Sequence, residues 1–241
     1  MRVVALIPAR FGSTRLPGKA LLDIAGKPMI QHVYERTAAA DGIAEVLVAT
    51  DDQRVVNAVE EFGGRAVMTR ADHQTGTDRL AEVAAGLTCD LVVNVQGDEP
   101  LIASQSIEIA VQPLLDRPDV PMSTLREALV DRAALEDPNA VKVVVDQDDF
   151  ALYFSRSPIP YRRDADQPLA YWRHIGLYVY RREFLLHYAQ LPPTPLQQAE
   201  SLEQLRALEH GYRIICPETP HHALGVDTPA DLERVRRLLA E

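Results

Sequence analysis

Three cations gather in the loop that follows the first apolar run of the chain. Val3–Ile7 predicts a buried parallel strand, and the segment 7–21 that continues it holds two glycines, two prolines, two hydroxyls and no carboxylate. Ligands of open α/β sheets sit outside the carboxyl ends of the strands, where a glycine-containing loop brings backbone N–H groups to phosphate oxygens. In a chain of net charge −10, the cluster of Arg10, Arg15 and Lys19 predicts a polyphosphate ligand. The alternative is a basic surface turn that caps the strand.

This loop is not a Walker A motif. That motif places four residues between its first glycine and the Gly-Lys pair, and Ser or Thr follows the lysine. Here five residues separate Gly12 from Gly18, and Ala20 follows Lys19. The spacing therefore disfavours a phosphotransferase of the Walker type.

Two acidic turns are candidates for a metal site. Gln96–Pro100 follows the apolar run Leu91–Val95 and contains Asp98, and a second turn holds Asp227 just before the last predicted helix. Mg²⁺ prefers oxygen ligands and often takes only one or two protein carboxylates. The alternatives are a solvated turn for the first segment and a helix cap for the second, with Asp227 or Thr228 on the free N–H groups.

Four further segments carry polar side chains that suit a nucleotide or a sugar. The loop 69–79 ends in Thr75, Gly76 and Arg79, which could contact a base edge and a ribose; His73 in the same loop receives no catalytic role. Segments 154–161, 173–180 and 200–206 supply an arginine, a face of alternating polar residues and an early helical turn rich in acceptors. From the pattern alone, the favoured interpretation of these last three is structural: an exposed arginine, a half-buried strand and a solvated helix face.

The order of the predicted elements indicates an α/β fold. The first half alternates strands and helices, which predicts an open, mostly parallel sheet with helices on both faces. The second half is more mixed, and we expect one domain over 1–241 with a smaller mixed sub-lobe within roughly 126–190. Strands are expected at 3–7, 45–49, 65–68, 91–95, 141–145, 151–154 and 174–180, and helices from about 28, then at 52–62, 77–86, from 104, at 181–190, 199–209 and from 228.

Composition narrows the class of protein. A chain of 241 residues with 46% hydrophobic and 25% charged residues is typical of a soluble globular protein. The acidic balance disfavours a nucleic-acid partner, and no apolar run is long enough for a membrane span. Cys89 and Cys216 have no metal or redox spacing, which predicts buried free thiols. With no signal peptide recognisable, a cytoplasmic enzyme is expected.

The motifs together resemble those of the acidic-sugar cytidylyltransferases, which include the 3-deoxy-D-manno-octulosonate (Kdo) cytidylyltransferases and the CMP-sialic acid synthetases. The loop 7–21 and Gln96–Pro100 carry the resemblance at the level of the superfamily. Arg-His-Ile-Gly-Leu-Tyr from Arg173 and Ser-Leu-Glu-Gln-Leu-Arg from Ser201 narrow it to the Kdo branch. One departure is Thr75, where the family usually has serine; the hydroxyl is kept.

The resemblance implies transfer of CMP from CTP to Kdo, which gives CMP-Kdo and pyrophosphate for lipopolysaccharide synthesis, in a homodimer that uses Mg²⁺. It implies a metal site at Asp98 and Asp227, and a catalytic set of Arg10, Arg15, Lys19, Asp98 and Asp227. The nucleotide-binding residues it implies are Pro8, Ala9, Arg10, Ser13, Arg15, Lys19, Thr75, Gly76, Arg79 and Gln96. Those for the acceptor sugar are Gln96, Arg156, His174, Tyr178, Glu200, Glu203 and Gln204.

Two other functions stay open at this stage. The acceptor could be a modified Kdo, such as the 8-amino form, or another acidic sugar. A regulatory nucleotide-binding protein without catalysis would also keep the loop 7–21, although it would not need both Asp98 and Asp227. No general base emerges from the sequence, and activation of the sugar hydroxyl by a metal makes one optional.

Overall fold

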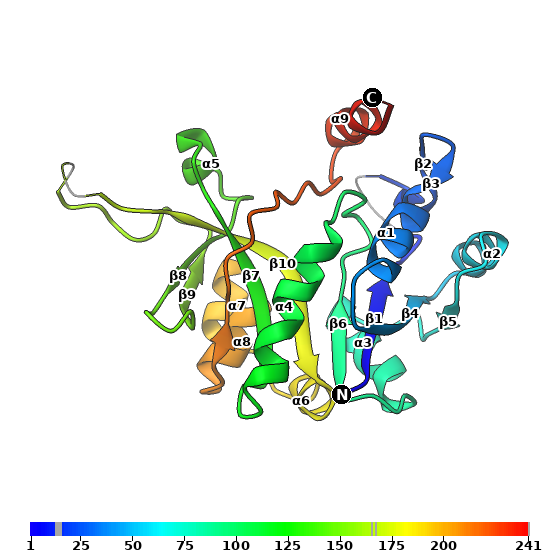
Figure 1. Ribbon diagram of the computed structural model, residues 1–241, viewed down its shortest axis with the longest axis horizontal. Coiled ribbons are helices and arrows are strands. Elements are labelled where there is room, and N and C mark those ends of the chain that lie inside the picture. The colour runs from blue at the N-terminus through cyan, green and yellow to red at the C-terminus, as the bar shows by residue number, and fades with distance from the viewer. Residues whose placement is uncertain (13–15, 165, 167, 241) are drawn as a thin grey trace.

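A computed structural model describes residues 1–12, 16–164, 166 and 168–240. Its main sheet has the strand order β11-β7-β10-β6-β1-β4-β5 (Figure 1). The strands β6 (Leu91–Asn94), β1 (Val3–Pro8), β4 (Ile43–Thr50) and β5 (Ala66–Met68) are parallel to one another. The predicted open, mostly parallel sheet is therefore confirmed.

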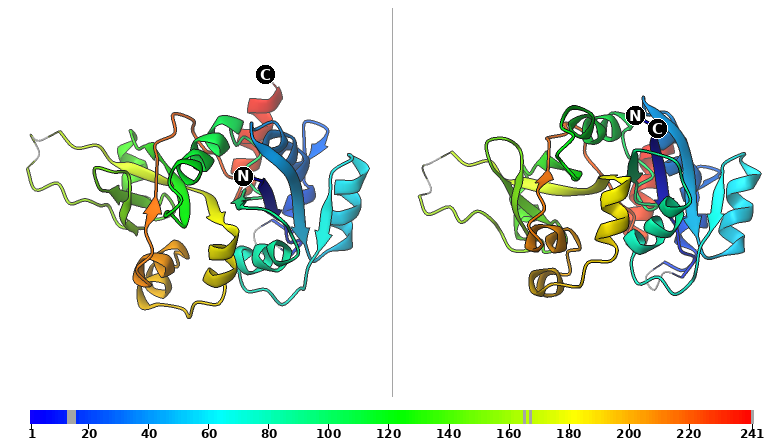
Figure 2. Two further views of the ribbon diagram at one scale, coloured as in Figure 1. Left: turned by 60° about the horizontal axis from the view of Figure 1, so that its bottom comes forward. Right: turned by 90° about the horizontal axis from the view of Figure 1, so that it is seen from below.

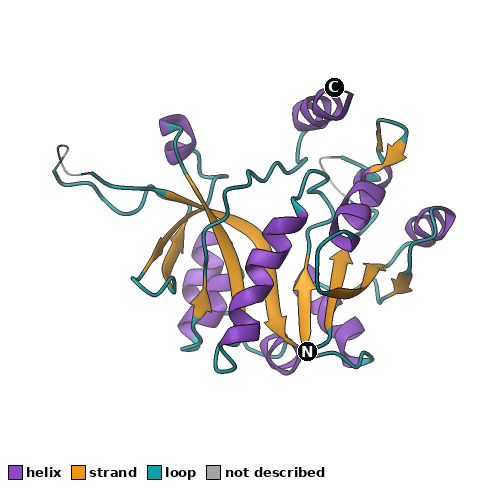
Figure 3. Ribbon diagram, viewed as in Figure 1, coloured by secondary structure: helices purple, strands orange, loops and turns teal. Residues whose placement is uncertain are grey.

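Strand β1 explains why the sheet is covered on both faces. Its residues are all apolar up to Pro8, and they divide alternately between two hydrophobic clusters: Val3, Ala5 and Ile7 on one face, Val4 and Leu6 on the other. Figure 3 shows helices packed against the sheet. Helices α1 (Met29–Ala38), α2 (Gln53–Glu61) and α4 (Ser104–Asp116) contribute to the first cluster, and α3 (Gly76–Ala85), α6 (Arg182–Tyr188) and α8 (Gln204–Glu209) to the second.

The second half of the chain adds antiparallel strands to the sheet. Strand β10 (Trp172–Arg181) lies antiparallel to both β6 and β7 (Met122–Ala128), and β11 (Ile214–Ile215) lies parallel to β7. The strands expected at 141–145 and 151–154 form an antiparallel hairpin of β8 (Lys142–Val145) and β9 (Ala151–Ser155), and β8 also pairs with β10. The described residues between β9 and β10 extend away from the body of the molecule (Figure 2). A sub-lobe within roughly 126–190 stays a prediction.

Several elements differ from the expectations. The single helix expected at 199–209 is two helices, α7 (Pro195–Glu200) and α8, because Ser201 between them has a φ of 51° and ends the first. Helix α1 begins at Met29 and not at Pro28, since Pro28 belongs to the short hairpin of β2 (Asp23–Ile24) and β3 (Lys27–Pro28). Strands β7 and β11, this hairpin and helix α5 (Arg132–Glu136) were not predicted.

A third, smaller apolar cluster joins the two ends of the chain. Leu16, Ile24 and Met29 pack against Val226, Leu232 and Val235, so that helix α9 (Pro229–Ala240) lies on the β2–β3 hairpin. Arg236 strengthens the contact by donating to the carbonyl of Asp23 at 3.0 and 2.7 Å.

The structure also bears on the predictions about the two cysteines and about membrane spans. Both cysteines are free, with Cys216 buried and Cys89 only half-buried. Among the helices in the described ranges, none has the length and apolar character needed to cross a membrane.

Candidate active site

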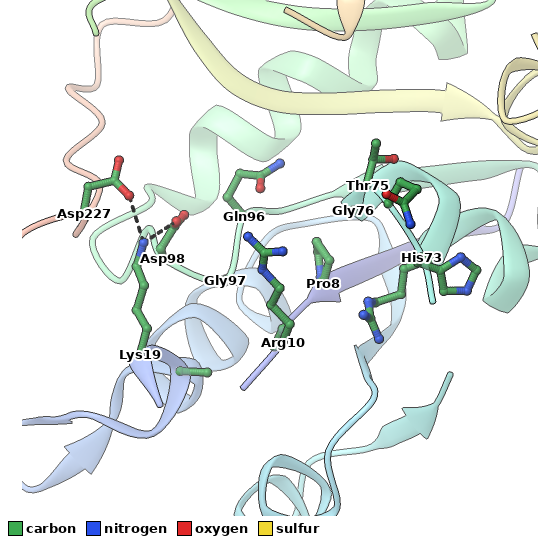
Figure 4. A pocket seen from close by; sticks show the side chains of 14 residues that line it. Pro8, Arg10, Lys19, His73, Thr75, Gly76, Gln96, Gly97, Asp98 and Asp227 are labelled. Carbon is green, nitrogen blue, oxygen red and sulfur yellow. Dashed lines mark hydrogen bonds and ion pairs between the residues drawn. The ribbon is translucent and has the colours of Figure 1, made fainter. Parts of the chain in front are cut away.

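A cavity of about 320 Å³ opens at the carboxyl ends of β1 and β6. It gathers the described members of the predicted nucleotide set with the two predicted metal carboxylates (Figure 4). The lining residues are Pro8, Ala9, Arg10, Lys19, Ala20, His73, Gln74, Thr75, Gly76, Arg79, Gln96, Gly97, Asp98 and Asp227. Ser13 and Arg15, predicted for the same site, lie outside the described residues.

Lys19 joins the two acidic turns. Its Nζ lies 2.7 Å from Asp98 Oδ2 and 3.1 Å from Asp227 Oδ1, and Figure 4 shows it between them. The 3₁₀ turn η1 (Lys19–Leu21) presents this side chain. The backbone N–H of Val226 donates to the carbonyl of Asp98 at 2.9 Å, which holds the two turns together. Segments more than 200 residues apart thus meet at one ammonium group.

The helix cap before α9 is formed by other atoms than the Asp227 carboxylate. The hydroxyl of Thr228 accepts from the N–H of Asp231 at 3.2 Å, and the Asp231 carboxylate accepts from the N–H groups of Asp227 and Thr228 at 3.1 and 2.8 Å. This confirms Thr228 as a cap. It leaves the side chain of Asp227 to face Lys19.

The two neighbouring carboxylates after β6 differ in environment. Asp98 has a side chain that is 38% exposed and lines the cavity. Glu99 is half-buried, and its Oε2 atom is buried without a hydrogen-bond partner in the described part of the protein. Burial and the charge of Asp98 raise the pKa of Glu99 to about 8, which makes it a poor anionic ligand at neutral pH. Asp98 is therefore the carboxylate suited to a cation.

The donor set fits Mg²⁺. The carboxylates of Asp98 and Asp227 face one common position. The ammonium group of Lys19 lies at that position. No cluster of three or more His, Cys, Asp or Glu able to hold a metal occurs within the described ranges. Two carboxylates in a cavity that Arg10 also lines match the habit of Mg²⁺, which completes its shell with water and phosphate oxygens.

Gly97 allows β1 and the turn after β6 to approach closely. A Cβ at this position would lie 2.8 Å from the carbonyl oxygen of Pro8, closer than real Cβ contacts. The sequence signal was a glycine between Gln96 and Asp98, but its role could only be recognised once the two segments were seen side by side. Ala20, His73 and Gln74 also line the cavity and were not in the predicted set.

Helix α3 supplies the opposite wall of the cavity. Thr75 caps it: the Thr75 hydroxyl accepts from the N–H of Asp78 at 3.1 Å, and the Asp78 carboxylate accepts from the N–H of Thr75 at 3.2 Å. The threonine thus performs the capping role for which serine would also serve. In its first turn, Arg79 is buried and donates to Asp51 Oδ2 at 3.0 Å and to the hydroxyl of Thr69. His73 is hydrogen-bonded to Glu82 further along the helix.

Of the predicted acceptor residues, Gln96 lines the cavity and the others do not. His174 and Tyr178 lie together on β10, with ring centroids 5.5 Å apart, as the alternation of the strand predicted. Gln96 links them to the cavity, since its amide donates to the carbonyl of Gly176 at 3.3 Å. Burial lowers the pKa of His174 to about 3, so its ring is neutral and bonds to the Thr124 hydroxyl at 2.8 Å.

The remaining acceptor candidates lie on α7, α8 and their surroundings. Glu203 accepts from the Thr77 hydroxyl at 2.7 Å, which ties α8 to α3, and the neighbouring Gln204 is buried. Arg156 directs its guanidinium to backbone carbonyls, namely those of Glu200 at 2.7 Å, Pro138 at 2.9 Å and Ser201 at 3.4 Å. The Glu200 carboxylate accepts from the N–H of Arg156 at 2.9 Å. In this structure Arg156 therefore braces two loops and does not reach the cavity.

The chain is similar to known proteins over its whole length. Residues 4–214 match the family described as Cytidylyltransferase. The 3-deoxy-manno-octulosonate cytidylyltransferase of Geobacter sulfurreducens is 56% identical, with 98% of each chain covered; that of Solibacter usitatus is 55% identical, with 98% of this chain and 94% of its own covered. A solved structure of CMP:2-keto-3-deoxy-manno-octonic acid synthetase complexed with CTP is 53% identical, with a TM-score of 0.96 over 100% of this chain and 99% of the other.

Proposed function

Because the chain belongs to the 3-deoxy-manno-octulosonate (Kdo) cytidylyltransferases, we propose that it transfers CMP from CTP to Kdo and releases CMP-Kdo and pyrophosphate. The observation that carries the assignment on this chain's own residues is the cavity that Arg10 and Lys19 line together with Asp98 and Asp227, where Lys19 is paired with both carboxylates. It combines cations for a triphosphate with carboxylates for a metal at the carboxyl ends of parallel strands.

In this reaction the anomeric hydroxyl of the sugar attacks the α-phosphorus of CTP, and pyrophosphate leaves in line. Such a transfer depends on positioning and on charge stabilisation more than on covalent help from the protein. Arg10 and Lys19, with Arg15 from the same loop, stabilise the charge that grows on the leaving pyrophosphate. Thr75, Gly76 and Arg79 hold the nucleoside on the side of the cavity formed by α3.

We further propose Asp98 and Asp227 as the residues that hold Mg²⁺. When bound, the ion would neutralise phosphate charge and lower the pKa of the attacking hydroxyl. Both carboxylates already point at one position, and Lys19 must move from that position toward the phosphates when CTP enters. Lys19 thus leaves the carboxylate oxygens of Asp98 and Asp227 and binds phosphate oxygens of CTP instead.

The acceptor sugar is proposed to bind between Gln96 and the group on β10, α7 and α8. Gln96 is the shared residue, because it lines the cavity and bonds to Gly176 of β10. His174, Tyr178, Glu200, Glu203 and Gln204 offer the mixed donors and acceptors that sugar hydroxyls require. Arg156 is the proposed partner of the sugar carboxylate, for which it must exchange carbonyl contacts for carboxylate contacts.

Three properties rest on the family resemblance and remain proposals: a homodimer, a cytoplasmic location and a role in lipopolysaccharide synthesis. Size-exclusion chromatography with light scattering tests the first, and cell fractionation tests the second. For the third, depletion of the protein should deplete lipopolysaccharide.

The central experiment measures pyrophosphate release by the purified protein. We expect release only when CTP, Mg²⁺ and Kdo are all present. A hexose 1-phosphate and water alone serve as control acceptors, and equal turnover with either would contradict the proposal. The 8-amino form of Kdo is included as a competing acceptor, and a higher kcat/KM for it than for Kdo would reassign the substrate.

A further inference from the structure

We propose that Asp51 is a positioning residue that selects the base of the nucleotide: it holds the Arg79 guanidinium so that the free edge of that group accepts cytosine and rejects uracil. This inference rests on the proposed function, since it concerns how CTP is chosen. Neither composition nor the motifs of the sequence drew attention to Asp51, which lies outside the loops that line the cavity.

The geometry around Arg79 is built from three separate elements. Asp51 directly follows β4, Thr69 directly follows β5, and Arg79 lies in the first turn of α3. Arg79 Nη2 donates to Asp51 Oδ2 at 3.0 Å, and Nη1 donates to the Thr69 hydroxyl oxygen. The side chains of Arg79 and Asp51 are 5% and 20% exposed. An ion pair this sheltered fixes the plane of the guanidinium more firmly than a surface pair would.

The hydroxyl of Thr69 is itself fixed. It donates to the carbonyl of Thr50 at 3.1 Å, and the Thr69 N–H donates to the same carbonyl at 2.8 Å. Because its own proton is committed, the hydroxyl can only accept from Arg79. The guanidinium is therefore held at two points by groups that belong to the ends of neighbouring strands.

Two of the five N–H donors of Arg79 are used in this way. In the described ranges no protein acceptor engages the others, and Arg79 lines the cavity. The remaining donors are thus available to a ligand. A buried, oriented donor pair that lacks a matching acceptor costs binding energy, which is how such groups discriminate between ligands.

The two pyrimidine nucleotides differ in what they offer to such a fork. Cytosine presents two adjacent acceptors, O2 and N3, whereas uracil presents O2 beside an N3–H donor. A guanidinium edge can bind both cytosine acceptors, but it meets a donor at N3 of uracil. Without Asp51 the guanidinium can turn, so that the advantage of cytosine is lost while contacts to the triphosphate remain.

The test is calorimetric binding of CTP and of UTP, each with Mg²⁺ and without acceptor sugar. For Asp51→Ala we expect CTP affinity to fall about tenfold, the scale of a hydrogen bond to a charged group, and UTP affinity to change less than twofold. Asp51→Asn keeps an acceptor oxygen and should retain most of the preference. Asp52→Ala is the matched control, because Asp52 caps α2 and pairs with Arg54, and neither residue lines the cavity; it should bind both nucleotides as the wild type does.

Thr69→Val is the second variant, which removes the other acceptor at nearly constant volume. It should lower the CTP preference in the same direction, so the inference can still be tested if Asp51→Ala does not fold. In an Arg79→Lys background, Asp51→Ala should cause little further loss. Equal weakening of CTP and UTP, or an unchanged preference, would overturn the inference while leaving the proposed function intact. A wild-type protein that binds UTP as well as CTP would instead contradict the proposed function and the inference with it.

Discussion

Lys19 Nζ lies 2.7 Å from Asp98 Oδ2, so the cation of the loop 7–21 neutralises the carboxylate that follows the central strand β6. With Asp227 at 3.1 Å on its other side, this ammonium occupies the position where two carboxylates would hold a divalent ion. Nucleotide binding must therefore redistribute charge between lysine, metal and phosphate.

The first prediction concerns metal binding without nucleotide. Lys19→Met keeps the length of the side chain and removes its charge, so Mn²⁺ should bind the nucleotide-free protein about tenfold more tightly, or about 1.4 kcal/mol. Turnover should fall at the same time, because the leaving pyrophosphate loses a cation. Calorimetric titration with Mn²⁺ measures the first effect; unchanged or weaker binding would mean that Lys19 does not compete for the carboxylates.

The second prediction concerns the carboxylates themselves. Asp98→Asn and Asp227→Asn should each lower kcat by about 10²–10³, since a metal acting on developing charge contributes several kcal/mol. Thr228→Ala is a matched control, because it removes the helix cap beside Asp227 and leaves both carboxylates in place. It should cost about 1 kcal/mol of stability and little activity. Near-normal turnover of either Asn variant at saturating Mg²⁺ would return that residue to a structural role.

Arg156→Lys should raise the KM for Kdo about ten- to a hundredfold, the range for a hydrogen bond to a charged group, and leave CTP affinity unchanged. A planar carboxylate suits the guanidinium fork, whereas lysine offers a point charge. The variant should also lower the free energy of unfolding, because the carbonyls of Glu200 and Pro138 lose their donor. Loss of stability with an unchanged KM would show that Arg156 is a brace only, and loss of CTP affinity would place it in the nucleotide site.

The buried ring of His174 predicts a stability that depends on pH. Burial lowers its pKa from 6.5 to about 3, so between these values the unfolded chain binds a proton that the folded protein excludes. This contribution to stability is fully present above pH 6.5 and is lost as pH falls toward 3, by up to about 1.4 kcal/mol for each unit. His174→Gln should flatten the decline of unfolding free energy between pH 7 and 5. His210→Gln, at an exposed histidine, is the control, and identical slopes for all three proteins would refute the assignment.

Gly97→Ala should distort the cavity by displacing the turn that follows β6. The added methyl group would lie 2.8 Å from the Pro8 carbonyl, so the turn carrying Asp98 must shift. We expect a loss of about 1–3 kcal/mol in stability, the usual cost of forcing extra volume into a packed site, together with weaker CTP binding. Gly176→Ala is the matched control, because its nearest neighbour would be Gln96 Cγ at 3.9 Å. Equal melting temperatures of the two variants would contradict the steric argument.

Much of the lining of the cavity could be predicted from local sequence. Residues 8–10 and 96–98 come at the ends of strands whose apolar runs are continuous, and the carboxyl ends of parallel strands meet at one edge of a sheet. Strand β7 was missed because polar residues interrupt its pattern. Ser123 donates to the carbonyl of Ala110 at 2.5 Å, and Arg126 and Glu127 pair with Asp149 and Arg173. Because those partners lie elsewhere in the chain, the sequence alone does not show that the polar groups of β7 are paired.

Contacts among the acceptor candidates were harder to predict for a related reason. That His174 and Tyr178 share a face follows from the period of a strand, but the contact of Arg156 with Glu200 depends on how β9 and α7 pack. The orientation of Arg79 by Asp51 likewise depends on the neighbouring order of β4, β5 and α3. Residue types indicate what a side chain can bind, whereas tertiary packing decides which partner it meets.

A small cluster packs Leu16, Ile24 and Met29 against Val226, Leu232 and Val235. This cluster also determines when the cavity can be completed during folding. During synthesis, the parallel strands β1, β4, β5 and β6 emerge from the ribosome long before Asp227 does. A nascent chain can form the loop 7–21 early, yet it lacks one of the two carboxylates that face Lys19 until α9 has docked. With Asp227 in its proposed role, activity begins only after α9 has docked on the segment 16–29, and shortening of α9 should abolish turnover while sparing the sheet.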